Sequence, residues 1–108
     1  MLADERCARI PCDTKPLGED EARGLAREIQ AWTLAGGAIE REFKFADFAG
    51  AMAFVNRVAQ VAEAEDHHPD ISISYSKVTL ILSTHSIGGL SRNDFILAAK
   101  IDRLAQTA

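Results

Sequence analysis

The chain has 108 residues, of which 47% are hydrophobic and 26% are charged, and its formal net charge is -4. This length suits one globular domain with a single core and is too short for two. The acidic balance argues against a protein drawn by charge to nucleic acid or anionic lipid, and no apolar run approaches the roughly 20 residues of a membrane span. Because the first residues are charged where a signal peptide is apolar, we expect a cytoplasmic protein.

Residues 1–16 combine charges, two prolines and both cysteines without an apolar period. This pattern is typical of an irregular terminal arm, so we expect order to begin near Leu17. A disulfide between Cys7 and Cys12 would close only a short loop, which favours two reduced thiols. A zinc site is not expected there, because two more soft ligands would be needed and all the histidines lie far downstream.

A first helix is predicted after Gly18. Three acidic residues follow this glycine and suit the positive end of a helix dipole. The helix would extend to about residue 32, because apolar residues then share one face: Ala22, Leu25, Ala26, Ile29 and Trp32.

Two strands are expected next, on either side of the turn at residues 35–37. Residues 38–45 alternate between apolar and charged side chains, which is typical of a half-buried strand. A short strand at residues 32–34 would pair with it across the turn.

Asp47 is then expected to cap the longest helix, which would end near Glu65. Its inward face is predicted from apolar residues at three- and four-residue spacing: Phe48, Met52, Val55, Ala59 and Ala62.

A second hairpin is predicted after Pro69. Apolar residues and serines alternate from Ile71, and the alternation changes phase after Lys77, which indicates a tight turn at residues 75–77. Ser91 followed by Asp94 resembles a capping box that opens a last helix.

The expected order is therefore α-β-β-α-β-β-α. It predicts one α+β domain over residues 17–108, a four-stranded antiparallel sheet with three helices packed on one face. An unpaired edge of such a sheet invites strand pairing with a second copy, so a homodimer is expected.

All three histidines, His67, His68 and His85, fall on the segment that joins the long helix to the second hairpin. Glu63 precedes His67 by four residues, so the two would share a helix face and could exchange a proton. His67 and His68 can serve one site only if Pro69 holds them in an irregular turn. On spacing alone an acid-base site, a metal site and an ordinary surface all stay open, since histidine is common at helix C-termini.

A longer pattern surrounds the histidines. It comprises residues 63–70 with their His-His-Pro, the Ser-Thr-His at residues 83–85, and Asp94, with Phe-Lys-Phe-Ala-Asp-Phe at residues 43–48 upstream. In order and spacing this pattern resembles the pterin-4a-carbinolamine dehydratase family from Trp32 onward. One departure is Ile71, where some members have an aromatic residue.

The resemblance implies a hydro-lyase. The reaction would convert 4a-hydroxytetrahydrobiopterin (pterin-4a-carbinolamine) to quinonoid dihydropterin and water, and would recycle the tetrahydropterin cofactor of aromatic amino acid hydroxylases. Groups that titrate near neutrality suit these proton transfers, so histidine acid-base catalysis with no metal and no cofactor is implied. By analogy the catalytic residues are His67, His68, His85 and Glu63, and the substrate-binding residues are Asp66, His67, His68, Ser83, Thr84, His85 and Asp94.

Which histidine is the acid and which the base stays open, with His67 the first choice. The implied partners are a pterin, a second copy of the chain in a homodimer or tetramer, and a functionally linked hydroxylase. Two other functions are compatible with the same residues. One is a non-catalytic binding module, either a transcriptional dimerisation cofactor or a pterin-binding protein, and the other is the same activity in molybdopterin metabolism.

Overall fold

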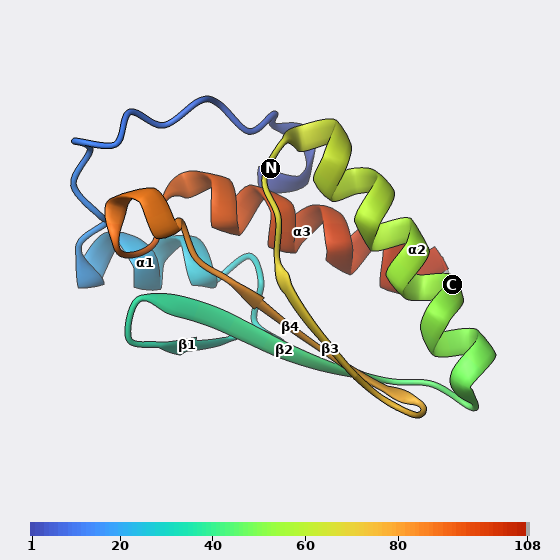
Figure 1. Cartoon of the computed structure of the whole chain (residues 1–108). Coiled ribbons are helices and arrows are strands. Elements are labelled where there is room, and N and C mark those ends of the chain that lie inside the picture. The colour runs from blue at the N-terminus through green and yellow to red at the C-terminus, as the bar shows by residue number, and fades with distance from the viewer. Residues whose placement is uncertain (108) are drawn as a thin grey trace.

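In the computed structural model, which describes residues 1–107, four strands form one antiparallel sheet with three helices over one face (Figure 1). This confirms the predicted α+β fold and its element order. The elements are α1 (Glu19–Ala26), β1 (Thr33–Ala35), β2 (Ala38–Lys44), α2 (Phe48–Glu65), β3 (Asp70–Ser74), β4 (Lys77–Leu82) and α3 (Arg92–Thr107), with short 3-10 helices η1 (Leu2–Asp4) and η2 (His85–Ile87).

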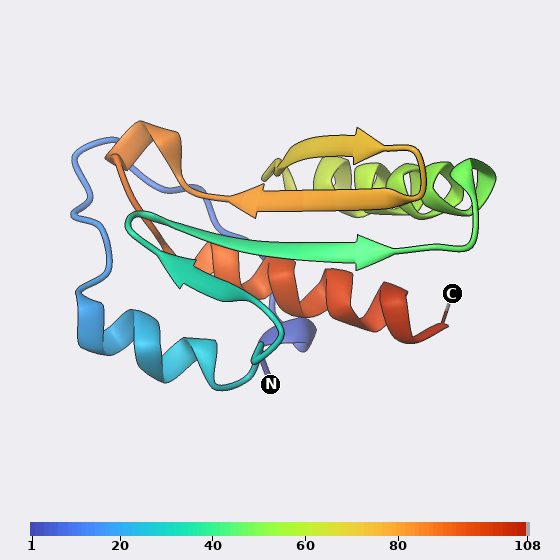
Figure 2. The same cartoon turned by 90° about the horizontal axis from the view of Figure 1, so that it is seen from below.

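The sheet has the strand order β1-β2-β4-β3, so each hairpin contributes one central strand and one edge strand. The central strands pair antiparallel from Ile39 opposite Leu82 to Lys44 opposite Lys77. Alternate residues of these strands are buried beneath the helices: Ile39, Phe43, Val78, Leu80 and Leu82. The other face of the sheet carries no helix of the described chain, as Figure 2 shows from below.

The first helix begins after Gly18 as predicted, but it ends at Ala26 and not near residue 32. Tight turns follow, in which the Ile29 N–H bonds to the Ala26 carbonyl and the Trp32 N–H to the Ile29 carbonyl. Ile29 and Trp32 remain buried, at 1% and 5% exposure. Apolar residues can therefore reach the core from consecutive turns just as they can from one long helix. Their spacing in the sequence does not distinguish a long helix from a short helix followed by turns.

Helix α2 has both predicted ends, and the Asp47 side chain accepts the Gly50 N–H at 2.8 Å. The prediction that Phe48 and Ala59 face inward is wrong, because Phe48 is half exposed and Ala59 is exposed. The inward face is centred instead on Phe54, whose ring centroid lies 4.7 Å from that of Phe43 and 5.1 Å from that of Phe45. The buried residues of this helix are Ala51, Phe54, Val55, Val58 and Ala62.

The second hairpin turns at Tyr75-Ser76, between Ser74 and its partner Lys77. This matches the predicted position of the turn. Strand β3 is the outer strand of the pair, and all its residues are exposed.

The N-terminal arm, residues 1–16, is ordered well before Leu17, which corrects the sequence expectation. Leu2 and Ala3 are buried in the core at 1% and 8% exposure, and η1 packs on α3. The Asp4 carboxylate pairs with Arg103 at 2.7 Å. Two apolar residues in one short turn have no period, so the sequence pattern could not indicate their burial.

Both cysteines are free thiols, as predicted. The arm runs along the helical side of the molecule from η1 to α1 (Figure 1). Within residues 1–107 no helix combines the length and the apolar character that crossing a membrane requires.

Candidate active site

The end of α2 places the first two histidines. Asp66 adopts the left-handed conformation, with φ 52° and ψ 42°. The Asp66 N–H bonds to the Glu63 carbonyl at 3.3 Å and the His67 N–H to the Ala62 carbonyl at 3.1 Å. These two bonds form a Schellman motif, in which an aspartate tolerates the position usually filled by glycine. The chain therefore reverses at Asp66 and sends residues 67–69 irregularly toward β3.

His67 is held by a buried carboxylate. Its Nε2 lies 2.6 Å from Oδ1 of Asp94, a residue with no exposed surface, while the His67 side chain is 12% exposed. The other oxygen, Oδ2, accepts hydrogen bonds from the Thr84 hydroxyl and the Ser91 N–H, both at 2.9 Å. The hydroxyls of Thr84 and Ser91 are themselves 2.7 Å apart. Asp94 thus joins the end of β4, the start of α3 and His67 in one network.

This network determines the tautomer of His67. An ionised carboxylate only accepts hydrogen bonds, so the His67 Nε2 carries the proton that points at Asp94. The other ring nitrogen, Nδ1, then has a free lone pair in the neutral ring. A carboxylate behind one nitrogen also stabilises the imidazolium that forms when the other accepts a proton. With Nε2 bonded to Asp94, Nδ1 is the ring nitrogen of His67 that is left to exchange a proton with a ligand.

The predicted contact between Glu63 and His67 is not formed. Glu63 pairs instead with His68, with 2.7 Å between Oε2 and Nε2. The left-handed turn at Asp66 ends the helical register before His67, so the four-residue spacing no longer brings the two side chains together. The pair of Glu63 and His68 is 77% and 55% exposed, so it is readily rearranged when a ligand arrives.

His85 and Ser83 lie on either side of Thr84. His85 Nε2 is 3.9 Å from Oδ2 of Asp70, and both side chains are more than two-thirds exposed. The Ser83 hydroxyl donates to the Gly37 carbonyl at 2.7 Å, which ties the end of β4 to the turn between β1 and β2. The His85 side chain is therefore open to solvent.

Three of the predicted site residues line one pocket of about 440 Å³, named here the His67 pocket: Asp66, His67 and Thr84. The other five are not on its wall: Glu63, His68, Ser83, His85 and Asp94, of which Asp94 bonds to His67 and Thr84. Residues that sequence reasoning did not select complete it: Cys7, Ala8, Arg9, Ile10, Glu65, Ser86 and Asn93. Four of these belong to the N-terminal arm, and contacts across more than fifty residues of chain leave no local sequence signal.

Neighbouring groups of the pocket wall shift the pKa values of Glu65 and Cys7. Burial alone raises the pKa of Glu65, but the Cys7 N–H and the charges of Lys100 and Arg6 outweigh it, so the pKa of this carboxyl is lowered. Burial, together with the negative charge of Glu65, raises the pKa of the Cys7 thiol to about 12. Cys7 is therefore a protonated thiol at neutral pH and is not a nucleophile of this site.

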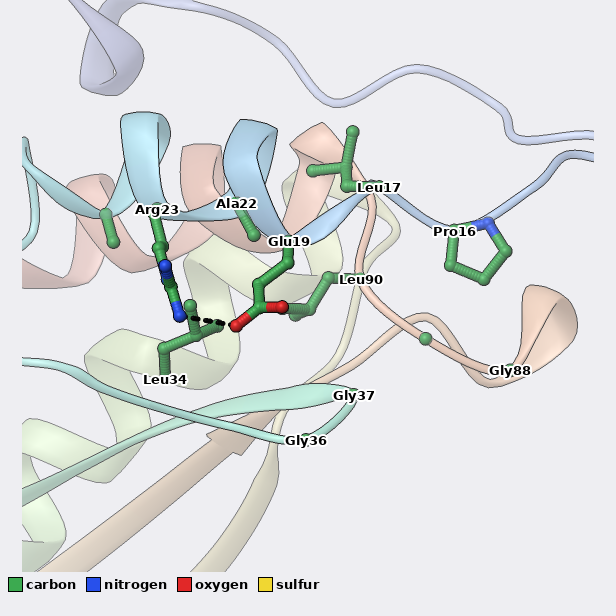
Figure 3. A pocket seen from close by; sticks show the side chains of 12 residues that line it. Pro16, Leu17, Glu19, Ala22, Arg23, Leu34, Gly36, Gly37, Gly88 and Leu90 are labelled. Carbon is green, nitrogen blue, oxygen red and sulfur yellow. Dashed lines mark hydrogen bonds and ion pairs between the residues drawn. The ribbon is translucent and has the colours of Figure 1, made fainter.

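A larger pocket, of about 680 Å³, lies between α1, the β1–β2 turn and the segment before α3 (Figure 3). Its two charged side chains, Glu19 and Arg23, form an ion pair with each other. It contains no histidine and none of the groups around Asp94. Without a group that titrates near neutrality, this pocket offers no acid-base chemistry.

Among residues 1–107 no group of three histidine, cysteine or acidic side chains is arranged to hold a metal ion. The chemistry that the described residues offer at the His67 pocket is proton transfer and hydrogen bonding to a polar ligand.

Comparisons with known proteins identify a family for this chain. Residues 15–104 match the family model described as pterin 4 alpha carbinolamine dehydratase. A relative from Nitrosospira multiformis, named as a pterin-4-alpha-carbinolamine dehydratase, is 47% identical over 97% of this chain and 93% of its own. A relative of the same name from Halorhodospira halophila is 46% identical over 95% of this chain and 96% of its own.

Two solved structures are also similar. One, a transcriptional coactivator/pterin dehydratase from Brucella melitensis, superposes with a TM-score of 0.80 at 35% identity, over 84% of this chain and 99% of that chain. The other is a pterin dehydratase-like protein identified as a RuBisCO assembly factor in the alpha-carboxysome. Its TM-score is 0.57 at 24% identity, over 68% of this chain and 86% of that chain, which shows a shared fold alone.

Proposed function

The chain belongs to the pterin 4 alpha carbinolamine dehydratase family, and from this premise we propose that it dehydrates 4a-hydroxytetrahydrobiopterin to quinonoid dihydropterin and water. The observation that carries the proposal is the pairing of His67 with the buried Asp94 on the wall of a polar pocket. A pocket of this kind suits a small ligand that is rich in hydrogen-bond donors and acceptors.

The reaction needs two proton transfers. The bond between C4a and the hydroxyl oxygen breaks, a double bond forms between C4a and N5, one proton reaches the leaving oxygen and one leaves N5. In our proposal the Nδ1 of His67 performs one transfer, with Asp94 stabilising the imidazolium state. His68 or His85 performs the other, since both are exposed and each is paired with a carboxylate, Glu63 or Asp70.

Substrate binding is proposed for the remaining polar groups around the pocket. Asp66 accepts from the amino and ring N–H groups of the pterin, while Thr84 and Ser83 contact it through hydroxyl lone pairs. In a cell the product would return to the tetrahydropterin used by an aromatic amino acid hydroxylase, or the same activity would serve molybdopterin metabolism. A hydroxylase encoded beside this chain favours the first setting.

We also propose a homodimer through strand β3. This strand lies at the edge of the sheet, so its outer N–H and C=O groups have no neighbouring strand within the described chain. Ile71, Ile73 and Tyr75 are exposed along it at 37%, 38% and 67%, and Phe48 is exposed at 50%. Pairing with a second β3 would satisfy the backbone and cover apolar side chains together.

The test of the reaction follows dehydration of freshly generated 4a-hydroxytetrahydropterin by ultraviolet absorbance. We expect the parent protein to accelerate it and His67→Ala to lose about a hundred-fold or more of the rate, the usual contribution of an acid-base group. Gln60→Ala, on the exposed side of α2, is the control and retains the rate. Circular dichroism confirms equal folded concentrations.

A folded parent without acceleration rules out the dehydratase. If that parent still binds a stable pterin, the binding-module function replaces it. The solved structure from Brucella melitensis is described as both a transcriptional coactivator and a pterin dehydratase. His67→Ala distinguishes the two functions, because it lowers the dehydration rate of an enzyme and leaves the function of a binding module unchanged.

A further inference from the structure

We propose that Arg9, on the N-terminal arm, is a substrate-binding residue of the His67 pocket. The inference rests on the proposed function and deepens it, because it assigns a pterin contact outside the segment that matches the family model, residues 15–104.

The arm is firmly attached where it passes the pocket. The Cys7 N–H donates to Oε1 of Glu65 at 2.8 Å, and Arg6 Nε lies 2.8 Å from the other oxygen of that carboxylate. Ala8 makes two bonds with the side-chain amide of Asn93: its N–H donates to Oδ1 at 3.0 Å and its carbonyl accepts from Nδ2 at 2.6 Å.

These attachment points lie beside the catalytic candidates. Glu65 directly precedes Asp66 and His67 in the chain, and Asn93 directly precedes Asp94. Because the arm is bonded to both, residues 7–10 are held at a fixed distance from the His67 ring. The arm therefore forms a preorganised wall of the pocket, opposite the elements that the family model covers.

Three polar side chains of the wall, those of Thr84, Asn93 and Glu65, are already engaged within the protein. The hydroxyl of Thr84 donates to Asp94, and both polar atoms of the Asn93 amide bond to Ala8. Glu65 accepts from Cys7 and pairs with Arg6. By contrast, Arg9 lines the pocket, and its guanidinium has no hydrogen bond or ion pair with any residue of the described part of the chain.

The chemistry of a pterin suits this arrangement. Its pyrimidine ring presents an amino group and a ring N–H as donors, and a carbonyl oxygen as acceptor on the same ring. The carboxylate of Asp66 matches the donors, but it repels an acceptor. Arg9 supplies the complementary cation, and a guanidinium donates through several N–H groups in one plane.

The experiment compares Arg9→Ala with Lys15→Ala, which removes the same charge from the same arm but lies off the pocket wall. We expect Arg9→Ala to raise KM about ten-fold with kcat changed less than two-fold, which corresponds to loss of one charge-assisted hydrogen bond to the substrate. Arg9→Lys recovers part of the loss, and Lys15→Ala behaves as the parent. Direct binding of 7,8-dihydrobiopterin, measured by calorimetry, weakens in the same order.

A second readout separates contact from docking of the arm. Cys7 is half-buried, and its thiol has a raised pKa, so slow alkylation of Cys7 by iodoacetamide reports that the arm is in place. We expect this slow rate in Arg9→Ala. Equal KM and equal pterin binding in Arg9→Ala and the parent overturn the role of Arg9 and leave the dehydratase proposal standing. A parent that neither binds nor dehydrates the pterin overturns both.

Discussion

The carboxylate of Asp94 decides which nitrogen of His67 carries a proton. It has no exposed surface and accepts from His67, Thr84 and Ser91. Removing the charge while keeping the shape tests whether this arrangement controls proton transfer.

Asp94→Asn is expected to reverse the tautomer. The Asn oxygen is retained by Thr84 and Ser91, so its amide N–H2 faces the His67 Nε2 and makes that nitrogen an acceptor. Nδ1 then carries the proton and cannot accept one from the substrate. We expect kcat to fall about 10- to 100-fold and the nitrogen chemical shifts of His67 to exchange between the two ring positions.

Asp102→Asn is the matched control for this variant. Asp102 accepts from Trp32 and Arg41 at 2.8 and 2.6 Å, away from the His67 pocket, so its loss changes packing and not proton transfer. Unchanged kcat and unchanged His67 shifts in Asp94→Asn contradict the assigned network.

At this scale the sequence predicted the identity of the candidate residues better than their pairing. Asp66, His67 and Thr84 meet at one pocket. Asp94 accepts the Ser91 N–H, as the predicted capping box requires, but its contact with His67 was not predicted, and Glu63 pairs with His68. Helical spacing predicts a contact only while the helix continues, and one left-handed residue at Asp66 is enough to end it.

The N-terminal arm is held by ion pairs as well as by the burial of Leu2 and Ala3. The Arg92 guanidinium lowers the pKa of Glu5 by hydrogen bonding, and that of Arg103 does the same for the pKa of Asp4. For Glu65, burial opposes ionisation, but the Cys7 N–H, Lys100 and Arg6 lower its pKa overall. A carboxyl whose pKa is lower in the folded chain stabilises the fold above its unfolded pKa, and this stabilisation is lost as the pH falls.

We therefore expect Glu65→Gln to lose stability at neutral pH but not in acid. Near pH 7 the free energy of unfolding falls by about 1–2 kcal/mol, because a neutral amide replaces a carboxylate that accepts from Cys7 and Arg6. As the pH falls below the ordinary glutamate pKa of about 4.3 and through the lower pKa of the folded chain, the parent carboxyl becomes protonated as well, so the two proteins converge. Thermal unfolding between pH 7 and pH 3 measures the difference.

Glu40→Gln serves as the control, since Glu40 is exposed on the open face of the sheet. Its difference from the parent should be small at every pH. A Glu65→Gln deficit that persists undiminished at pH 3 contradicts the ionic attachment of the arm.

Element boundaries show what periodicity can and cannot determine. The caps at Gly18 and Asp47 and the turn at residues 75–77 rest on local chemistry, and the structure confirms all three. The length of α1 and the burial of Leu2 depend on what the chain meets in the core. Such tertiary contacts have no sequence period, so they were not predictable.

The whole molecule is a two-layer structure with an asymmetric surface. One face of the sheet is covered by helices and the other is open (Figure 2). Apart from Met1 at the N-terminus, the large exposed apolar side chains lie along one edge, at β3, its turn and the start of α2. They do not lie across the open face, where Glu40 and Glu42 alternate with buried residues. Large exposed apolar groups that share an edge with unpaired backbone mark that edge for association.

We expect the parent to sediment as a dimer or larger assembly at tens of micromolar and Ile73→Lys to sediment as a monomer. Ile73 is 38% exposed, so a lysine there is tolerated by the fold but places a charge in the proposed contact. Thr79→Lys, on the open face of central strand β4, adds the same charge away from that edge and is expected to leave the assembly intact.

A monomeric parent contradicts association, whereas an assembly disrupted by Thr79→Lys and not by Ile73→Lys places the contact on the open face of the sheet. Since the His67 pocket is lined by residues of one chain, dehydration by the Ile73→Lys monomer should stay within about two-fold of the parent.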